Sequence, residues 1–270
     1  MKILNGLELA SYIKQRQKDE VYSLKVNHNI QPYLAIIVTV DNPVINLYIS
    51  LKQKYGKDIN VDVTVHKAGP DSVRELIKKL NNDPTVNGII IQLPIYDPSK
   101  TEELVNLVDS KKDVDALSRN SIFDPATPMA ILWLISGYNI DLNNKKVLII
   151  GKGKLVGQPL SKILIKSHVN VTIADRSTKN LKELTLGSEV IITATGSPAI
   201  LFPEMFSKNV IVIDAGVASE DGRVVGDLDD SVYQRDDLML TPKKGGVGPL
   251  TVCALFENVI RAIQFQSEDD

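Results

Sequence analysis

The sequence predicts an α/β protein with two α/β lobes around a cleft. The chain has 270 residues, which exceeds one typical domain and suggests two. Its apolar residues, 43% of the total, supply ample material for a core in each lobe. Helical and strand patterns alternate along the chain, which is the order expected of parallel α/β layers.

In the first lobe, amphipathic stretches predict helices and short apolar runs predict strands. Asn42 and Pro43 are the start signals of one of these helices. The predicted helices cover residues 7–25, 44–55, 72–80 and 101–108. The predicted strands cover residues 33–40, 60–66 and 88–93.

A loop-rich segment, residues 118–128, indicates the crossing into the second lobe. We assign residues 1–117 to the first lobe, completed by a C-terminal segment at 249–270, and residues 118–248 to the second. The second lobe begins with a helix over residues 129–136. Its predicted strands cover residues 147–150, 169–174, 189–194 and 210–214. A final helix over residues 251–263 follows a predicted loop at 243–249.

The strand 147–150 runs into a glycine-rich turn, GKGKLVGQP at residues 151–159, and then into an apolar helical stretch. Such a unit suits a dinucleotide pyrophosphate, because the helix N-terminus offers free N–H groups to negative charge. Gly151 suits the tight turn, Gly153 lets the backbone approach the phosphates, and Gly157 lets the helix pack closely. Three residues separate Gly153 from Gly157 where the common pattern has two, so an ordinary βα loop is the alternative. The motif indicates a Rossmann-like NAD(P)-binding lobe with a mainly parallel sheet.

The next predicted strand ends at Asp175-Arg176-Ser177, where a Rossmann lobe reads the adenosine ribose. An acidic residue here accepts from the 2′-hydroxyl of NAD, whereas an arginine with a nearby hydroxyl holds the 2′-phosphate of NADP. With Lys152 added from the glycine turn, the cationic set favours NADP, and NAD is the alternative because of Asp175. The predicted cofactor-binding residues are Gly151, Lys152, Gly153, Lys154, Val156, Gly157, Arg176, Ser177, Thr195, Gly196, Gly216 and Val217.

Composition argues against several other classes of protein. The formal net charge is −2 and the charges are interspersed, which disfavours nucleic acid as a partner. Cys253 is the only cysteine, and a reducing cytoplasm is the simplest compartment. No apolar run approaches the ~20 residues of a membrane span, and the first residues lack a signal-peptide pattern. The histidines, His28, His66 and His168, are too scattered in the sequence to predict a metal site.

The predicted helix 44–55 carries a lysine beside an apolar stripe. Lys52 lies four residues after Tyr48, on the margin of a stripe formed by positions 44, 47, 48, 51 and 55. Partial desolvation there would lower the pKa of a lysine toward neutrality, and Tyr48 offers a flat face to an aromatic ligand. On the residues alone, the ordinary alternative of a solvated amine is favoured.

Five segments together resemble the bifunctional methylenetetrahydrofolate dehydrogenase/cyclohydrolase family along almost the full chain. The resemblance lies in the family's DNP and YxxxK helix, its GxxVQLP strand, its KDVDG turn, its glycine loop and its PGGVGPMT signature. The corresponding residues here are 41–52, 88–94, 112–115, 151–159 and 245–251. The family's pattern also explains the three-residue glycine spacing, although its loop serine is replaced here by Gly153.

The resemblance implies roles for the matching positions. Catalytic residues would be Lys52 as acid/base, Gln92 as its hydrogen-bond partner and Asp115, which would bind the pterin. Tyr48 would stack on the aminobenzoyl ring, and Pro249 and Leu250 would line the folate side of the cleft. The implied activity is oxidation of 5,10-methylenetetrahydrofolate with NADP, then hydrolysis to 10-formyltetrahydrofolate.

The resemblance further implies a cytoplasmic homodimer whose substrates are tetrahydrofolate derivatives, acting in one-carbon metabolism and purine biosynthesis. The alternatives are a monofunctional NAD-dependent dehydrogenase, a shikimate-type dehydrogenase and a non-catalytic NADP-binding protein. The last of these would have no reason to combine Tyr48, Lys52 and Gln92.

Overall fold

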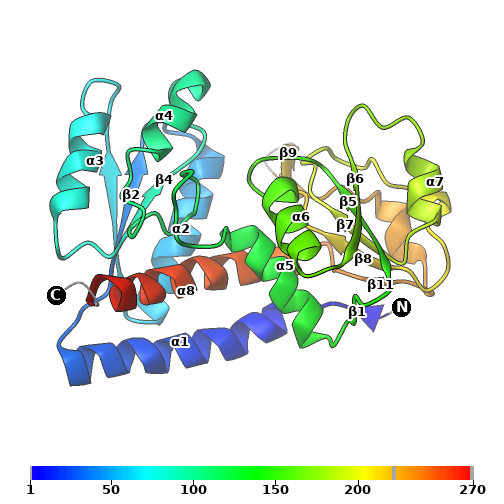
Figure 1. Ribbon diagram of the computed structural model, residues 1–270, viewed down its shortest axis with the longest axis horizontal. Helices are drawn as coiled ribbons and strands as arrows, with labels where there is room; N and C mark the ends of the chain where they lie inside the picture. The colour runs from blue at the N-terminus through cyan, green and yellow to red at the C-terminus, as the bar shows by residue number, and fades with distance from the viewer. Residues whose placement is uncertain (1, 221–222, 268–270) are drawn as a thin grey trace. The chain divides into compact units, whose positions relative to one another are not determined.

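Two compact units make up the structure, a computed structural model that describes residues 2–220 and 223–267. One unit comprises Ser11–Ala126 and Val252–Asp270, and we call it the three-strand unit. The other comprises Met1–Ala10 and Thr127–Thr251, and we call it the six-strand unit. Each contains a parallel sheet with helices packed on it (Figure 1), which confirms the predicted α/β class.

This division differs from the predicted lobe boundaries mainly at the N-terminus. Residues 1–10 fall in the six-strand unit, because strand β1 (Lys2–Ile3) pairs in parallel with β11 (Met239–Leu240). The two later boundaries fall after residues 126 and 251 instead of after 117 and 248. A two-residue strand is too short to show an alternating pattern, so its pairing could not be predicted.

The three-strand unit has a parallel sheet in the order β3-β2-β4. The central strand supplies two layers of core, because alternate side chains point to opposite faces. Ala35 and Ile37 pack with Val73 and Ile77 of helix α3 in one fully buried cluster. The strands are β2 (Tyr33–Val38), β3 (Asp62–Lys67) and β4 (Gly88–Ile91). The helices are α1 (Gly6–His28), whose residues 6–10 fall in the six-strand unit, α2 (Pro43–Asp58), α3 (Val73–Asn82), the short 3₁₀ turn η1 (Pro98–Lys100) and α4 (Thr101–Val105).

Helix α2 begins as predicted, but it buries a different face. Asn42 Oδ1 accepts a hydrogen bond of 2.8 Å from Val44 N, and Pro43 occupies the first turn. The buried residues are Ile45, Ile49 and Gly56, whereas Leu47 and Leu51 of the predicted stripe are 47% and 44% exposed. The prediction that this stripe is the face of α2 packed on the core is therefore wrong. Lys52 falls in helical register with the buried set rather than at the margin of the predicted stripe.

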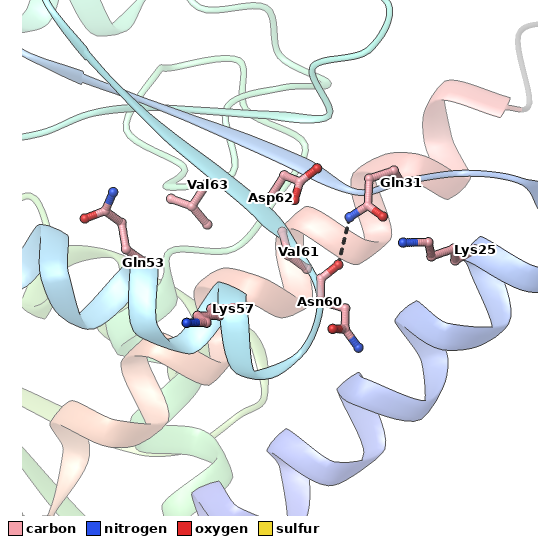
Figure 2. A pocket seen from close by; sticks show the side chains of 8 residues that line it. All are labelled: Lys25, Gln31, Gln53, Lys57, Asn60, Val61, Asp62 and Val63. Atoms are coloured by element: carbon pink, nitrogen blue, oxygen red, sulfur yellow. Dashed lines mark hydrogen bonds between the residues drawn. The ribbon is translucent and has the colours of Figure 1, made fainter.

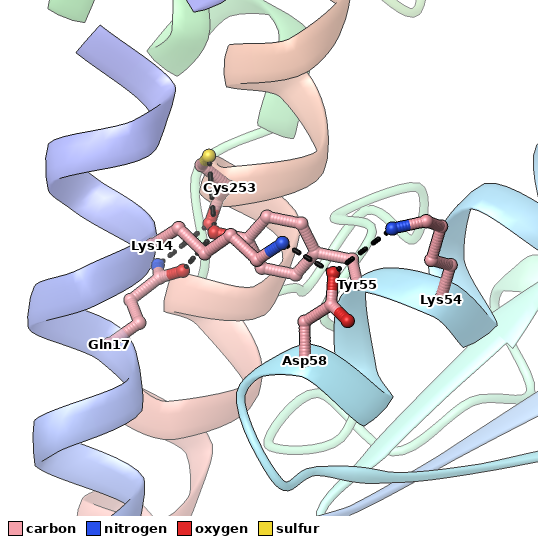
Figure 3. Close-up of polar contacts among 6 residues, drawn as sticks. All are labelled: Lys14, Gln17, Lys54, Tyr55, Asp58 and Cys253. Carbon is pink, nitrogen blue, oxygen red and sulfur yellow. Dashed lines mark hydrogen bonds and ion pairs between the residues drawn. The ribbon is translucent and has the colours of Figure 1, made fainter. Parts of the chain in front are cut away.

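Side-chain hydrogen bonds fasten the C-terminal half of α2 to α1 and to α8 (Val247–Ser267), as Figure 3 shows. Tyr55 donates to Oε1 of the fully buried Gln17 at 2.7 Å and lies 3.2 Å from Cys253 Sγ. Gln17 Nε2 in turn donates to the Cys253 carbonyl at 2.9 Å. Asp58 also pairs with Lys14 of α1 at 2.5 Å. Two helices, α1 and α8, therefore fix the orientation of α2 within this unit. Cys253 is fully buried, as expected for a small apolar side chain.

The sheet of the six-strand unit is parallel throughout, in the order β1-β11-β8-β7-β5-β6. After β5 the chain first adds β6 on one side and then β7 on the other, so the strand order reverses at β5. Open α/β sheets bind ligands at the carboxyl end of such a reversal. The strands β5 (Lys146–Ile150), β6 (Asn170–Ala174), β7 (Val190–Thr193) and β8 (Ile211–Asp214) confirm four predicted strands.

Shorter elements complete this unit. The helices are α5 (Ala126–Gly137), α6 (Gly157–Lys166), α7 (Leu181–Leu186) and the 3₁₀ turns η2 (Pro203–Met205) and η3 (Asp230–Gln234). Strands β9 (Ala218–Glu220) and β10 (Arg223–Val225) pair antiparallel in a separate ribbon. Within residues 2–220 and 223–267, every helix is too short or too polar to cross a bilayer.

Helix α8 starts four residues earlier than predicted. Gly245 has φ +87°, a backbone conformation that favours glycine, and the helix begins two residues later at Val247. The last part of the predicted loop 243–249 is therefore the first turn of the helix. Pro249 is tolerated there because an N–H in the first turn has no helical partner. The start of α1 packs against this loop, since Leu7 N donates to the Gly245 carbonyl at 3.0 Å.

Candidate active site

The three-strand unit brings together three of the predicted catalytic residues. Lys52 lies on α2, and Gln92 directly follows β4. Lys52 Nζ donates a hydrogen bond of 2.6 Å to Gln92 Oε1. Gln92 N donates to the Ile37 carbonyl at 2.9 Å, so the chain continues the sheet pairing up to this residue. The Gln92 side-chain amide donates to the Leu93 carbonyl at 3.1 Å, which leaves its oxygen facing the lysine. Asp115 is close enough for its charge to act on Lys52.

The turn before Asp115 is held by its own neighbours. The buried Lys112 donates to the carbonyls of Leu80, Asn81 and Asp83, at 3.2, 2.8 and 2.7 Å, at the C-terminal end of α3. A cation is favourable at this end of a helix. Asp113 accepts from the backbone N–H groups of residues 117 and 118 at 3.3 and 2.8 Å. Asp113 therefore takes the turn-forming role, and the charge of Asp115 acts on Lys52.

Burial shifts the pKa values of both charged groups toward their neutral forms. Desolvation lowers the pKa of the Lys52 ammonium, and the Asp115 carboxylate acts in the opposite direction. Desolvation also raises the pKa of Asp115; the Lys52 charge lowers it, and the Asp113 charge adds to the increase. A lysine with a lowered pKa can accept a proton nearer neutral pH than a solvated lysine can.

Tyr48 lies one helical turn before Lys52 and is partly buried. Burial raises the pKa of its hydroxyl, so the ring is neutral at physiological pH. Its position on the same helical face would let it contact a ligand that also reaches Lys52. Pro249 and Leu250, by contrast, belong to the other unit. Leu250 is fully buried, so in this structure its side chain offers no surface to a ligand.

In the six-strand unit, the glycine turn lies at the carboxyl end of β5, where the strand order reverses. Gly151 has φ +109°, and a Cβ there would lie 2.5 Å from the Ala194 carbonyl oxygen. A Cβ at Gly157 would overlap the Gly151 carbonyl, so helix α6 packs directly on the turn. Gly153 has open space around its Cβ position, so packing does not require glycine there. Two of the three predicted glycine roles thus have a steric basis.

The segment after β6 forms a turn around Asp175. Ser177 donates to Asp175 Oδ1 through its backbone N and its hydroxyl, at 2.9 and 2.6 Å, and Asp175 N donates to Thr178 Oγ1 at 3.0 Å. The Ser177 hydrogen bonds, and the nearby charge of Lys152, lower the pKa of Asp175. Lys152 therefore lies near this turn, as predicted, and Arg176 and Ser177 are exposed. Asp175 orders the turn that carries the predicted phosphate-binding residues.

Lys154 and Val156 lie in the turn after β5, and the other predicted cofactor residues, Thr195, Gly196, Gly216 and Val217, lie on the loops after β7 and β8. Gly196 has φ +65°, and Gly216 lies against a carboxylate that no sequence pattern indicates. That carboxylate belongs to the fully buried Asp227, and the end of β8 carries a second one, Asp214. Burial and the charge of Asp227 raise the pKa of Asp214 to about 6. Apart from the local bond between Gly216 N and Asp214, their hydrogen bonds connect residues 13 to 34 positions apart, so no local pattern predicts them.

A polar surface pocket of about 310 Å³ lies elsewhere on the three-strand unit (Figure 2). Gln31 Nε2 bonds to the Asn60 carbonyl at 2.9 Å across it. Its lining residues are Lys25, Gln31, Gln53, Lys57, Asn60, Val61, Asp62 and Val63. None of these is a predicted site residue. Among the residues that the structure describes, no cluster of three His, Cys, Asp or Glu side chains could hold a metal ion.

Comparison with known proteins gives matches over both units. Residues 4–115 match the catalytic domain, and residues 125–267 the NAD(P)-binding domain, of the family described as tetrahydrofolate dehydrogenase/cyclohydrolase. The Bifunctional protein FolD of Lactobacillus acidophilus is 33% identical over 279 residues, which cover 98% of each chain. The crystal structure of the bifunctional enzyme FolD, a methylenetetrahydrofolate dehydrogenase/cyclohydrolase from Campylobacter jejuni, is 31% identical. It has a TM-score of 0.92 and covers 98% of this chain and 99% of that one. A bifunctional 5,10-methylenetetrahydrofolate dehydrogenase/cyclohydrolase from Thermoplasma acidophilum is 30% identical, with a TM-score of 0.89 and coverage of 99% and 100%.

Proposed function

Because this chain belongs to the tetrahydrofolate dehydrogenase/cyclohydrolase family, we propose that it oxidises 5,10-methylenetetrahydrofolate with NADP and hydrolyses the methenyl product to 10-formyltetrahydrofolate. The single observation that best supports the hydrolytic activity is the hydrogen bond of 2.6 Å between Lys52 and Gln92. The charge of Asp115 also acts on Lys52. An amine with a lowered pKa, held by an oriented amide, is suited to moving protons at a folate nitrogen.

The residues around Lys52 would divide the work of binding and chemistry. Asp115 would accept hydrogen bonds from the aminopyrimidine of the pterin, because a carboxyl group matches its donors. Tyr48 would stack on the aminobenzoyl ring. The predicted roles of Pro249 and Leu250 are not part of this proposal, because both residues belong to the other unit and Leu250 is fully buried there.

The six-strand unit would hold the dinucleotide. The turn at 151–157 fits a pyrophosphate, because Gly151 and Gly157 let helix α6 begin directly against the turn. Lys152, Arg176 and Ser177 would bind the 2′-phosphate, and Asp175 would order their turn, because one of its oxygens accepts two bonds from Ser177. When bound, NADP supplies the hydride acceptor.

In the second reaction, water attacks the methenyl carbon. Neutral Lys52 would accept one proton from that water and return it to a folate nitrogen as the bond between that nitrogen and the methenyl carbon breaks. The second proton of the water would leave to solvent as the formyl carbonyl forms. Gln92 would keep the amine aimed at the reacting atoms, because its own nitrogen is bonded to the Leu93 carbonyl. Burial favours the neutral amine that this step requires.

The proposal also covers the compartment, the oligomeric state and the metabolic role of the enzyme. We infer a cytoplasmic homodimer that associates through its cofactor-binding unit and supplies one-carbon units, including those for purine biosynthesis. The single cysteine, buried at position 253, suits a reducing compartment. Gel filtration with light scattering would measure the oligomeric state.

One assay tests the activity and its cofactor. Purified protein is mixed with methylenetetrahydrofolate and either NADP or NAD, and the methenyl and formyl products are followed by absorbance. We expect both products and faster turnover with NADP. Methenyl product that accumulates without hydrolysis would indicate a monofunctional dehydrogenase, and NADP binding without either product would indicate a non-catalytic protein.

The Lys52→Met variant tests the acid/base role. We expect cyclohydrolase activity to fall by about a hundredfold or more, because general acid–base catalysis contributes that much. Affinity for NADP, measured by titration calorimetry, should stay at the parent value, since Lys52 lies in the other unit. Hydrolysis of methenyltetrahydrofolate by the variant at the parent rate would rule out this assignment.

A further inference from the structure

The six-strand unit contains a buried carboxylate bonded to the end of β7 and to the loop that follows it. Asp227 is fully buried, and its two oxygens accept three hydrogen bonds. Oδ2 accepts from the hydroxyl of Thr193 and, at 2.8 Å, from Thr195 N. Oδ1 accepts from Ser197 N at 3.1 Å. The loop at 195–197 is therefore wrapped around one side chain that comes from about 30 residues further along the chain.

A second carboxylate holds the segment that carries the first. Asp214, the last residue of β8, accepts at Oδ2 from Asp227 N at 2.9 Å and from Leu228 N at 3.2 Å. Its other oxygen accepts from Gly216 N at 2.8 Å, in the loop that follows β8. The two loops that leave neighbouring strands β7 and β8 are thus joined through one pair of acids.

The packing leaves no room for adjustment around this pair. A Cβ at Gly216 would overlap the Asp227 carboxylate, and a Cβ at Gly226 would overlap that of Asp214. Each carboxylate therefore lies directly on the backbone of a loop. Glycine at position 216, one of the predicted cofactor-binding residues, is explained by this contact.

An amide could not replace Asp227 without losing a bond. A carboxylate accepts at both oxygens, whereas the nitrogen of asparagine is a donor and cannot accept from a backbone N–H. Burial of a charged group is unfavourable, so a carboxylate at this place is explained best by the geometry it imposes. The bonds to Thr195 and Ser197 fix both sides of Gly196, whose φ is +65°.

The topology relates these loops to one half of a dinucleotide. The pyrophosphate-binding turn follows β5, and the 2′-phosphate residues follow β6 on one side of it. The loops after β7 and β8 lie on the other side of β5, so the nicotinamide half would extend over them. We propose that Asp227, supported by Asp214, is a positioning residue that shapes the 195–197 loop for the nicotinamide half of NADP. This inference rests on the proposed cofactor site.

Paired ligands test this role. Affinities of the full-length protein for NADP and for 2′,5′-ADP, which lacks the nicotinamide half, are measured by titration calorimetry. In Asp227→Asn we expect NADP to bind about tenfold more weakly, the effect of losing a charge-assisted hydrogen bond, with 2′,5′-ADP affinity unchanged. Asp230→Asn is the matched control, because it removes the same charge from a side chain that is 86% exposed and three residues away.

Equal weakening of both ligands, or an unchanged NADP affinity, would overturn the proposal. If Asp227→Asn does not fold, Thr193→Val decides the question, because it removes one donor to Asp227 with little change in shape. We then expect a smaller loss, about threefold, again confined to NADP. An unchanged NADP affinity in that variant would overturn the inference. A parent protein that binds neither ligand would instead refute the proposed cofactor site.

Discussion

At the scale of single residues, the decisive question is the protonation state of Lys52. The Asp115 carboxylate opposes the desolvation that lowers the pKa of Lys52. Replacing Asp115 by Asn removes this opposing charge, so the pKa of Lys52 should fall further. The rate of methenyltetrahydrofolate hydrolysis rises with pH as Lys52 loses its proton, and this rise should move to lower pH in Asp115→Asn.

Two measurements check the shift: the pH profile of hydrolysis and the ¹⁵N resonance of the Lys52 amine. The NMR titration does not require turnover, so it separates the charge effect from weakened pterin binding. Asp71→Asn, an exposed site on the same unit, should leave both curves in place. A midpoint that stays fixed or moves to higher pH in Asp115→Asn would contradict the coupling.

A second prediction concerns the pH dependence of stability that arises from Asp214. Burial and the charge of Asp227 raise its pKa from 3.8 to about 6 in the folded protein. The folded state therefore holds this proton more tightly than the unfolded chain does. The carboxyl contributes stability at low pH, and that contribution is lost as the pH rises from about 4 to about 6.

Urea denaturation of the parent and of Asp214→Asn across this pH range measures the effect. The difference in free energy of unfolding, parent minus variant, should fall by on the order of 2 kcal/mol as the pH rises. A difference that is flat, or that rises with pH, would show that Asp214 does not titrate in this window.

At the scale of elements, the packing of α6 on the glycine turn requires a glycine at position 157. Gly157→Ala would press a methyl group against the Gly151 carbonyl and push α6 away from β5. We expect a loss of stability of about 1–3 kcal/mol, typical of overpacking, together with weaker NADP binding. Gly69→Ala is the matched control, because the space around Gly69 is open and it is not a predicted cofactor-binding residue. Thermal melts and NADP titrations of both variants measure the contrast, and equal behaviour of the two would contradict it.

Elements with a strong local pattern were predictable from the sequence, and those defined by distant partners were not. The longer strands of the two sheets and the Asn42 cap of α2 follow from apolar runs and a start signal. The buried face of α2 does not, because the helix carries two apolar stripes and only contact with the sheet selects the one with Ile45 and Ile49. The two-residue strands β1 and β11 exist only through pairing.

The same distinction applies to the site. The bond between Lys52 and Gln92 agrees with the pairing that the family resemblance implied, although the residues alone favoured a solvated lysine. Asp214 and Asp227 were not predicted, because aspartates near loops ordinarily form turns, as Asp175 does. Their role depends on which loops the fold brings beside them.

At the scale of the whole molecule, the chain contains two units with separate cores and separate candidate sites. Each ligand should therefore stabilise its own unit most directly, since binding protects the groups that it orders. We expect NADP to slow amide exchange mainly in residues 151–157 and 195–197. Tetrahydrofolate should slow it mainly in the middle of α2, around Tyr48 and Lys52, and in the segment after β4.

Hydrogen exchange with mass spectrometry, on the full chain with each ligand alone and with both, measures this pattern. Lys52→Met is expected to leave the NADP-dependent protection intact, and Gly157→Ala to reduce it while leaving the tetrahydrofolate effect in place. Because the two variants lie in different units, they form a reciprocal pair of controls. Protection by NADP that appears mainly around Lys52, or by tetrahydrofolate mainly around Gly157, would contradict the assignment of folate to the three-strand unit and NADP to the six-strand unit.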